Sequence, residues 1–175
     1  MKKTVITYGL IAGTIATLMM LYGTYSCYKD PNFEASEVFG FAGMFIAFTF
    51  VFIGIKNFRD KQNEGYITFS EAFKIGAMIT LIASTCYVGV WLIEYYCFFP
   101  DFMEKFTATT LKHAKESGLS AVELAAKSAE MDMYKEWYKN PLMVILMTYA
   151  EILPIGLVIA LISALILKKK KQVTV

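Results

Sequence analysis

The stretch PLMVILMTYAEILPIGLVIALISALIL, residues 141–167, decides the fold class of this chain. It contains one ionisable residue, Glu151, and is longer than the roughly 20 apolar residues that cross a bilayer as a helix. Asn140 suits the N-cap position, and Pro141 suits the first helical position, where its missing N–H costs nothing. Lysines 168–171 follow the stretch at once. The sequence therefore predicts a transmembrane helix over residues 141–167.

Three earlier stretches have the same character. The first follows Lys2 and Lys3, and the third begins next to Thr68 and Glu71, which form a capping-box pattern. We expect no cleaved signal peptide, because the first apolar run is too long and no small-x-small site follows it. We predict an all-α polytopic membrane protein, one membrane domain over residues 1–175, with four transmembrane helices at about 4–25, 38–55, 70–93 and 141–167.

The composition supports this class. Apolar residues make up 57% of the chain and charged residues 18%, whereas soluble domains have about 45–50% and roughly 25%. The net charge of +2 conceals a segregation, with lysines at both ends and acids in the middle. The composition therefore gives no indication of nucleic-acid binding, and the partner it predicts is the lipid bilayer.

The polar segment between the last two spans has the pattern of a helical hairpin. Gly118 suits the end of a first helix, and Ser120 with Glu123 forms a capping box for a second. We predict this hairpin over about 101–139. Apolar residues of the second helix recur at spacings of three and four, which predicts a face that needs the membrane surface or another helix. This face consists of Val122, Ala126, Ala129, Met133 and Trp137.

The distribution of basic residues predicts the orientation. Lysines flank both chain ends, and the segment 56–74 carries four basic residues, while the segment 27–37 has one. Basic residues in short loops favour the cytoplasmic side, and long loops cross regardless of charge. We therefore expect a multi-pass protein of the bacterial inner membrane with both termini cytoplasmic and the hairpin outside.

Glu151 is the most unusual residue of the fourth span. It lies about ten residues into the helix, hence ~15 Å deep and near the bilayer midplane. Buried ionisable groups in membranes usually face the bundle interior or a cavity. A structural interpretation is a carboxyl hydrogen-bonded to Tyr87, Thr85 or a hydroxyl of the first span; the alternative is transport or proton handling. Pro154, one turn on, frees a backbone carbonyl and can kink the helix.

Stripes of small residues mark several helices as close-packing elements, since small-xxx-small patterns let helix backbones approach each other. In the fourth span this stripe points away from Glu151, so two opposite faces of one helix require protein contacts. Either this helix is central in the bundle, or one of its faces meets a second protein. With only four spans available, we expect a homo-oligomer or another membrane protein as partner. The stripes comprise Gly9 and Gly13, Gly43 and Ala47, and Gly156, Ala160 and Ala164.

The sequence has no recognisable catalytic, metal or cofactor site. No Ser-His-Asp set, HExxH motif or phosphate-binding glycine loop occurs, and the only histidine, His113, has no ligand cluster beside it. We therefore expect no catalytic residue, no metal and no cofactor. Cys27 and Cys97 both fall near the outer boundary and are candidates for a disulfide, provided that their Cα atoms come within about 7 Å.

The ordered residues resemble an uncharacterised inner-membrane family of Bacteroidetes-type bacteria, the domain of unknown function 4199. The resemblance implies four spans and no reaction, and it includes Glu151 and Pro154 in a family motif. It extends over nearly the whole chain through the segments 55–61 (IKNFRDK), 65–69 (GYITF), 72–76 (AFKIG), 138–141 (YKNP), 151–156 (EILPIG) and 161–167 (LISALIL).

These observations favour a non-enzymatic accessory or assembly component that binds other membrane proteins or itself. The alternative is a small transporter or channel in which Glu151 handles a cation or a proton. A membrane enzyme ranks third, because Glu94, Asp101 and Glu151 would have to act without an evident nucleophile.

Overall fold

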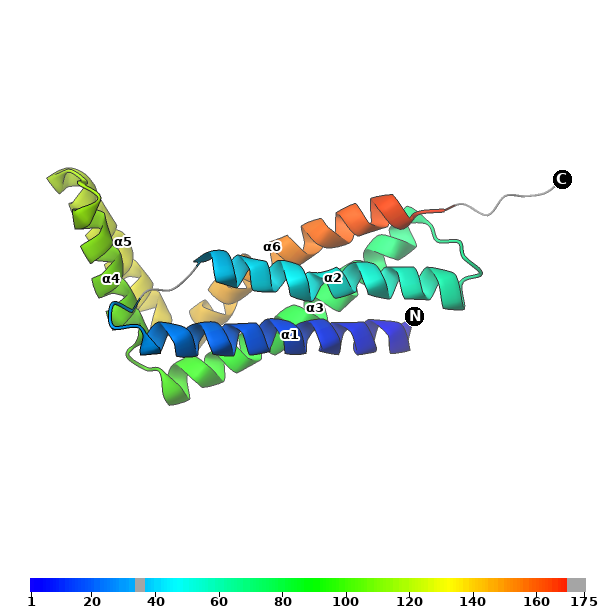
Figure 1. The fold of residues 1–175 in the computed structure, drawn as a ribbon, viewed down its shortest axis with the longest axis horizontal. Helices are drawn as coiled ribbons and strands as arrows, with labels where there is room; N and C mark the ends of the chain where they lie inside the picture. The colour runs from blue at the N-terminus through cyan, green and yellow to red at the C-terminus, as the bar shows by residue number, and fades with distance from the viewer. Residues whose placement is uncertain (34–36, 170–175) are drawn as a thin grey trace.

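The computed structural model describes residues 1–33 and 37–169 and is almost entirely helical (Figure 1). Four long helices form an elongated bundle, and two shorter helices pack on each other at one of its ends. We call this end the hairpin end and the opposite one the terminal end. The elements are α1 (Lys2–Lys29), α2 (Glu37–Gln62), α3 (Phe69–Ile93), the π-helix η1 (Glu94–Phe98), α4 (Phe102–Glu116), α5 (Ala121–Tyr138) and α6 (Pro141–Leu167).

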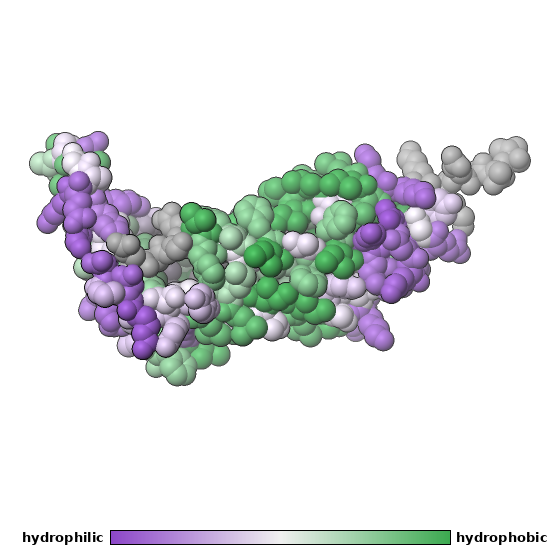
Figure 2. Space-filling view, in the orientation of Figure 1, coloured by the Kyte–Doolittle hydropathy of each residue, from purple (hydrophilic) through white to green (hydrophobic). Residues whose placement is uncertain are grey.

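The four predicted spans are confirmed as long apolar helices. The face of the molecule shown in Figure 2 has an apolar band over the middle of the bundle between two polar ends, as a membrane protein requires. The helices extend beyond the predicted ranges: α1 continues to Lys29, and α2 continues about two turns past residue 55. Polar residues can prolong a helix beyond the apolar run. The end of the helix is therefore set by the turn residues that follow and not by the last apolar residue. After α2 the turn is formed by Glu64 and Gly65, which have φ angles of 52° and 81°.

The predicted helix boundaries are found where the sequence contained cap residues. Complete capping boxes are present at Thr68 with Glu71 and at Ser120 with Glu123. Asn140 accepts a hydrogen bond from the Leu142 amide at the start of α6. Gly118 has a φ of 78° and follows α4, where its amide and that of the next residue bond back to the last turn.

The terminal end brings together the start of α1, the α2–α3 turn and the end of α6. The Met1 amino group donates to Gln62 Oε1 at 3.0 Å, and Gln62 Nε2 donates to the Thr4 hydroxyl at 2.6 Å. Ile67 and Lys169 exchange two backbone hydrogen bonds of 3.0 and 2.8 Å. Residue 1 and residue 169 therefore lie at the same end of the bundle, opposite α4 and α5 (Figure 1).

The small-residue stripes of α1 and α2 form contacts between helices of the same chain. A Cβ added to Gly9 would lie 2.8 Å from Ile82, and one on Gly13 would lie 2.9 Å from Cys86, so α1 packs closely on α3. A Cβ on Gly43 would lie 3.1 Å from Met19, and Ala47 is fully buried. These four residues let α1, α2 and α3 approach one another.

The small-residue stripe of α6 also packs against other helices of the same chain. A Cβ on Gly156 would lie 2.8 Å from Phe48, and Ala160 and Ala164 are fully buried. Ala160 packs against Gly76 of α3, where an added Cβ would lie 2.8 Å from it. This face of α6 is therefore covered by α2 and α3 inside the chain, and the expected partner protein stays a prediction.

Candidate functional site in a membrane-embedded cavity

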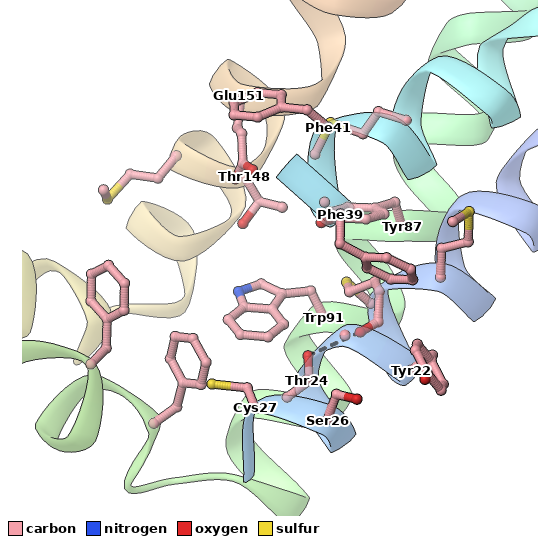
Figure 3. Close-up of a pocket in the computed structure, with 18 of the residues that line it drawn as sticks. Tyr22, Thr24, Ser26, Cys27, Phe39, Phe41, Tyr87, Trp91, Thr148 and Glu151 are labelled. Atoms are coloured by element: carbon pink, nitrogen blue, oxygen red, sulfur yellow. Dashed lines mark hydrogen bonds between the residues drawn. The ribbon is translucent and has the colours of Figure 1, made fainter. Parts of the chain in front are cut away.

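A cavity of about 810 Å³ lies in the hairpin half of the bundle. It opens because α6 packs on α2 and α3 but not closely on α1, so α1 and the start of α6 are separated. Figure 3 shows side chains from α1, α2, α3 and α6 turned toward this common space. The α4–α5 pair contributes the remaining wall through Phe102, Phe106, Tyr134 and Tyr138.

The lining is apolar, aromatic and rich in methionine, with a few polar groups. Aromatic side chains come from α1, α2, α3, α4 and α5, whereas α6 contributes none, and the methionines come mainly from α1 and α2. Hydroxyl groups are supplied by Thr24 of α1 and Thr148 of α6, among others. Such a surface suits a hydrophobic or amphiphilic molecule, because polar groups at a few points can orient an otherwise apolar ligand.

A contact between α1 and α4 holds the short helices over the cavity. The Tyr28 hydroxyl donates to Asp101 Oδ1 at 2.7 Å, and Lys105 Nζ lies 2.8 Å from Asp101 Oδ2. The same ammonium lies 4.4 Å from the centre of the Tyr28 ring. The hydrogen bonds from Lys105 and Tyr28 lower the pKa of Asp101, so this contact carries a charged carboxylate at neutral pH.

Aromatic pairs extend this contact into the cavity wall. Phe99 lies 4.2 Å from the Tyr28 ring, and Phe102 meets Trp91 edge-on at 5.1 Å between ring centroids. Tyr138 at the end of α5 meets Tyr95 edge-on at 5.1 Å. Burial, and then the nearby Glu151 carboxylate, raise the pKa of Tyr138 to about 12, which keeps its hydroxyl protonated as a hydrogen-bond donor.

Glu151 of α6 lines the cavity, next to Thr148 one turn earlier on the same helix (Figure 3). The hydrogen bond expected from Thr85 is absent, because the Thr85 hydroxyl pairs with Tyr149 at 2.8 Å. Tyr87 and Thr148 line the same cavity. Within residues 1–33 and 37–169, Glu151 makes no hydrogen bond or ion pair, so its carboxyl is available to a ligand.

Glu94 is a second acidic residue in this half of the bundle, and its burial was not predicted. We expected a polar segment to begin here, but the helix continues as η1 and the Glu94 side chain is 4% exposed. It lies beside Thr24, whose hydroxyl donates to the Met20 carbonyl at 3.1 Å. Glu94 Oε2 has no hydrogen-bond partner among the described residues. π-Helical turns of this kind occur frequently at functional sites.

The structure thus brings some of the predicted site residues together and separates others. Glu151 and Cys27 line the cavity, but Pro154 does not, and α6 continues through it as a helix. Cys27 is buried, Cys97 is exposed on η1, and both are free thiols. The disulfide considered for this pair is not present in this structure, and pairing of the two thiols stays a prediction.

The sequence contained a signal for the α3 wall that the prediction did not use. Tyr87, Trp91 and Glu94 follow one another at spacings of four and three, which places them on one face of the helix that runs from α3 into η1. The periodicity itself indicated a continuous wall.

A family model described as "Protein of unknown function (DUF4199)" matches residues 7–169. The match covers all four long helices and the α4–α5 pair. Searches of curated proteins and of solved structures gave no match.

Proposed function

Because the chain belongs to the family of proteins of unknown function DUF4199, which implies no activity, we propose a function from its own structure: a non-enzymatic membrane protein that binds a hydrophobic or amphiphilic small molecule. The cavity beside Glu151 carries this proposal. Its volume of about 810 Å³ falls within the roughly 300–1,000 Å³ typical of small-molecule sites. Its lining, which is mostly apolar with a few polar groups, is also typical of small-molecule sites.

The packing beyond the cavity supports binding rather than open conduction. Toward the terminal end, the fully buried side chains of Phe48, Ile79 and Ile152 fill the bundle. A molecule that enters from the hairpin end therefore meets Glu151 and then a packed core. The transporter hypothesis from the sequence needs a second state in which this core opens. The binding step is common to both interpretations.

We further propose that the terminal end is cytoplasmic, which places the cavity in the outer half of the bacterial inner membrane. This orientation rests on the lysines at the terminal end and on the positive-inside rule.

Trp91 supplies an intrinsic reporter for a binding test. The chain has two tryptophans, and Trp91 lines the cavity, so a Trp137→Phe protein reports from that residue alone. The purified variant in a maltoside detergent is titrated with a neutral brominated alcohol, 10-bromodecanol. We expect saturable quenching of Trp91 fluorescence by the bromine atom.

Two glycines provide a matched pair of variants. A Cβ on Gly40 or on Gly89 meets no atom within 4 Å, so a larger side chain is tolerated at both sites. Gly40 lines the cavity and Gly89 does not. Gly40→Phe should abolish saturable quenching, and Gly89→Phe should leave it intact. Linear, unsaturable quenching in the parent protein, or equal quenching in both variants, would refute the binding function.

A second candidate function, the accessory or assembly component, is favoured by the surface of α5. The predicted apolar face is uncovered: Val122 is 80% exposed and Met133 43%, with Ala126 and Ala129 exposed between them. A second copy of the chain or another membrane protein would cover it. Gentle extraction and sizing test this candidate, since Val122→Asp should dissociate the assembly, and a monomeric parent would exclude self-association.

A further inference from the structure

We propose that the cavity is selective for lipophilic cations, meaning amphiphiles that carry an amine or a quaternary ammonium group. This inference rests on the proposed binding function and assigns its ligand class. The charge of the lining is the first observation. Its ionisable acids are Glu151 and Asp30, and none of the described lining residues is a lysine, an arginine or a histidine.

Glu151 supplies the anchoring charge. Its carboxyl has no partner among the described residues and lies at the end of an apolar space. A cation placed there is paired with a carboxylate in a medium of low dielectric constant, where the attraction between opposite charges is much stronger than in water. An anionic amphiphile, such as a fatty acid, would instead be repelled by this group.

Aromatic faces supply the second element of cation recognition. Trp91, Tyr87 and Phe39 line the cavity and are labelled together in Figure 3. Cations are attracted to aromatic faces, most strongly to tryptophan, and quaternary ammonium ligands are commonly held by such side chains. The apolar tail of an amphiphile can pack on the methionines of α1 and α2, whose flexible side chains adapt to irregular shapes.

A second acid, Glu94 of η1, lies buried behind the wall of the cavity. Glu94 is 4% exposed, and its Oε2 has no hydrogen-bond partner among the described residues. It lies beside Thr24, which lines the cavity. Lys105 of the hairpin is held by Asp101 and does not line the cavity. A ligand cation would therefore meet the Glu151 carboxyl without competition from a cationic side chain of the described lining.

The test compares two probes of equal shape and different charge. One is a decyltrimethylammonium with a terminal bromine, and the other is its neutral isostere, in which a tert-butyl carbon replaces the nitrogen. Both are titrated against the Trp137→Phe protein in maltoside detergent, with Trp91 quenching as the readout. A brominated decanoate serves as the anionic arm. We expect the cation to bind at least about tenfold more tightly than the neutral isostere, and the anion more weakly than both.

Variants of Glu151 assign the selectivity to its charge. Glu151→Gln should reduce the preference for the cation severalfold and leave the affinity for the neutral isostere unchanged. Glu151→Asp, which keeps the charge, should retain the preference. Glu116→Gln, a change of an exposed acid in α4, is the control and should have no effect. Binding of the neutral isostere also shows that each variant is folded.

The outcomes separate the two proposals. Equal binding of the cationic and the neutral probe would overturn the cation selectivity and leave the binding function standing. A preference that persists in Glu151→Gln would overturn the role of this carboxyl. Saturable binding of none of the three probes would overturn the selectivity and count against the binding function as well.

Discussion

At the scale of single residues, close helix packing depends on glycines. Atoms of a neighbouring helix lie in the space that a side chain at these positions would occupy. Gly76 is an example, because an added Cβ would lie 2.8 Å from the Ala160 Cβ and 3.0 Å from Ile55. Alanine has no rotatable side chain that could move aside, so α3 and α6 would have to separate. The sequence marked Ala160 as a packing residue, but its partner became visible only in the structure.

Gly76→Ala should therefore destabilise the bundle by about 1–3 kcal/mol, the typical cost of overpacking a filled core. Gly89→Ala is the matched control, since its Cβ meets nothing within 4 Å and the change should be neutral or mildly stabilising. Thermal unfolding in detergent, followed by tryptophan fluorescence, measures both. Equal melting temperatures for the two variants would contradict the described α3–α6 contact.

At the scale of elements, the α4–α5 pair is attached to the bundle at a few points, among them the contact of Tyr28 with Asp101 and Lys105. The helices themselves were predictable, because Gly118 and the Ser120–Glu123 capping box fix their ends locally. Their placement over the cavity was not predictable. It depends on contacts between residues 73 positions apart in the chain, such as that of Tyr28 with Asp101.

The lowered pKa of Asp101 gives this attachment a defined pH dependence. Because the folded pKa lies below the ordinary 3.8, the stabilisation is fully present above about pH 4 and is lost as the pH falls through the lowered value. Trp91 emission in the Trp137→Phe protein reports the contact with Phe102. It should stay constant from about pH 8 to 5 and change below about pH 4.

Asp101→Asn is the control for this titration. It removes the titrating group, so the component of the acid transition that belongs to Asp101 should disappear. A change of Trp91 emission centred near neutral pH, or an identical acid transition in Asp101→Asn, would show that another group controls the position of the hairpin.

At the scale of the whole molecule, the number and the connectivity of the spans followed from the sequence, while the cavity did not. Long apolar runs and cap residues are local signals, so the four helices were predictable. The cavity results from how α1 and the start of α6 separate, which is a property of packing between distant segments. Glu151 was recognised because an acid in an apolar span is costly, whereas Glu94 was assigned to a loop because it follows the apolar run.

The orientation of the bundle can be tested with single cysteines in a background that lacks Cys27, Cys86 and Cys97. Glu116→Cys lies at the far end of α4, and Lys61→Cys lies at the terminal end. We expect a membrane-impermeant maleimide to label the first in intact cells and the second only after permeabilisation. The reverse pattern would invert the proposed topology.

The central claim is that the cavity beside Glu151 holds a small molecule in the membrane, and native mass spectrometry tests it most directly. The protein is extracted gently from its own membrane and compared with Gly40→Phe and Gly89→Phe. The account predicts a discrete small-molecule adduct on the parent chain and on Gly89→Phe that is missing from Gly40→Phe. The account would be contradicted if the parent chain carried no such adduct. It would also be contradicted if Gly40→Phe carried the adduct to the same extent as the parent chain.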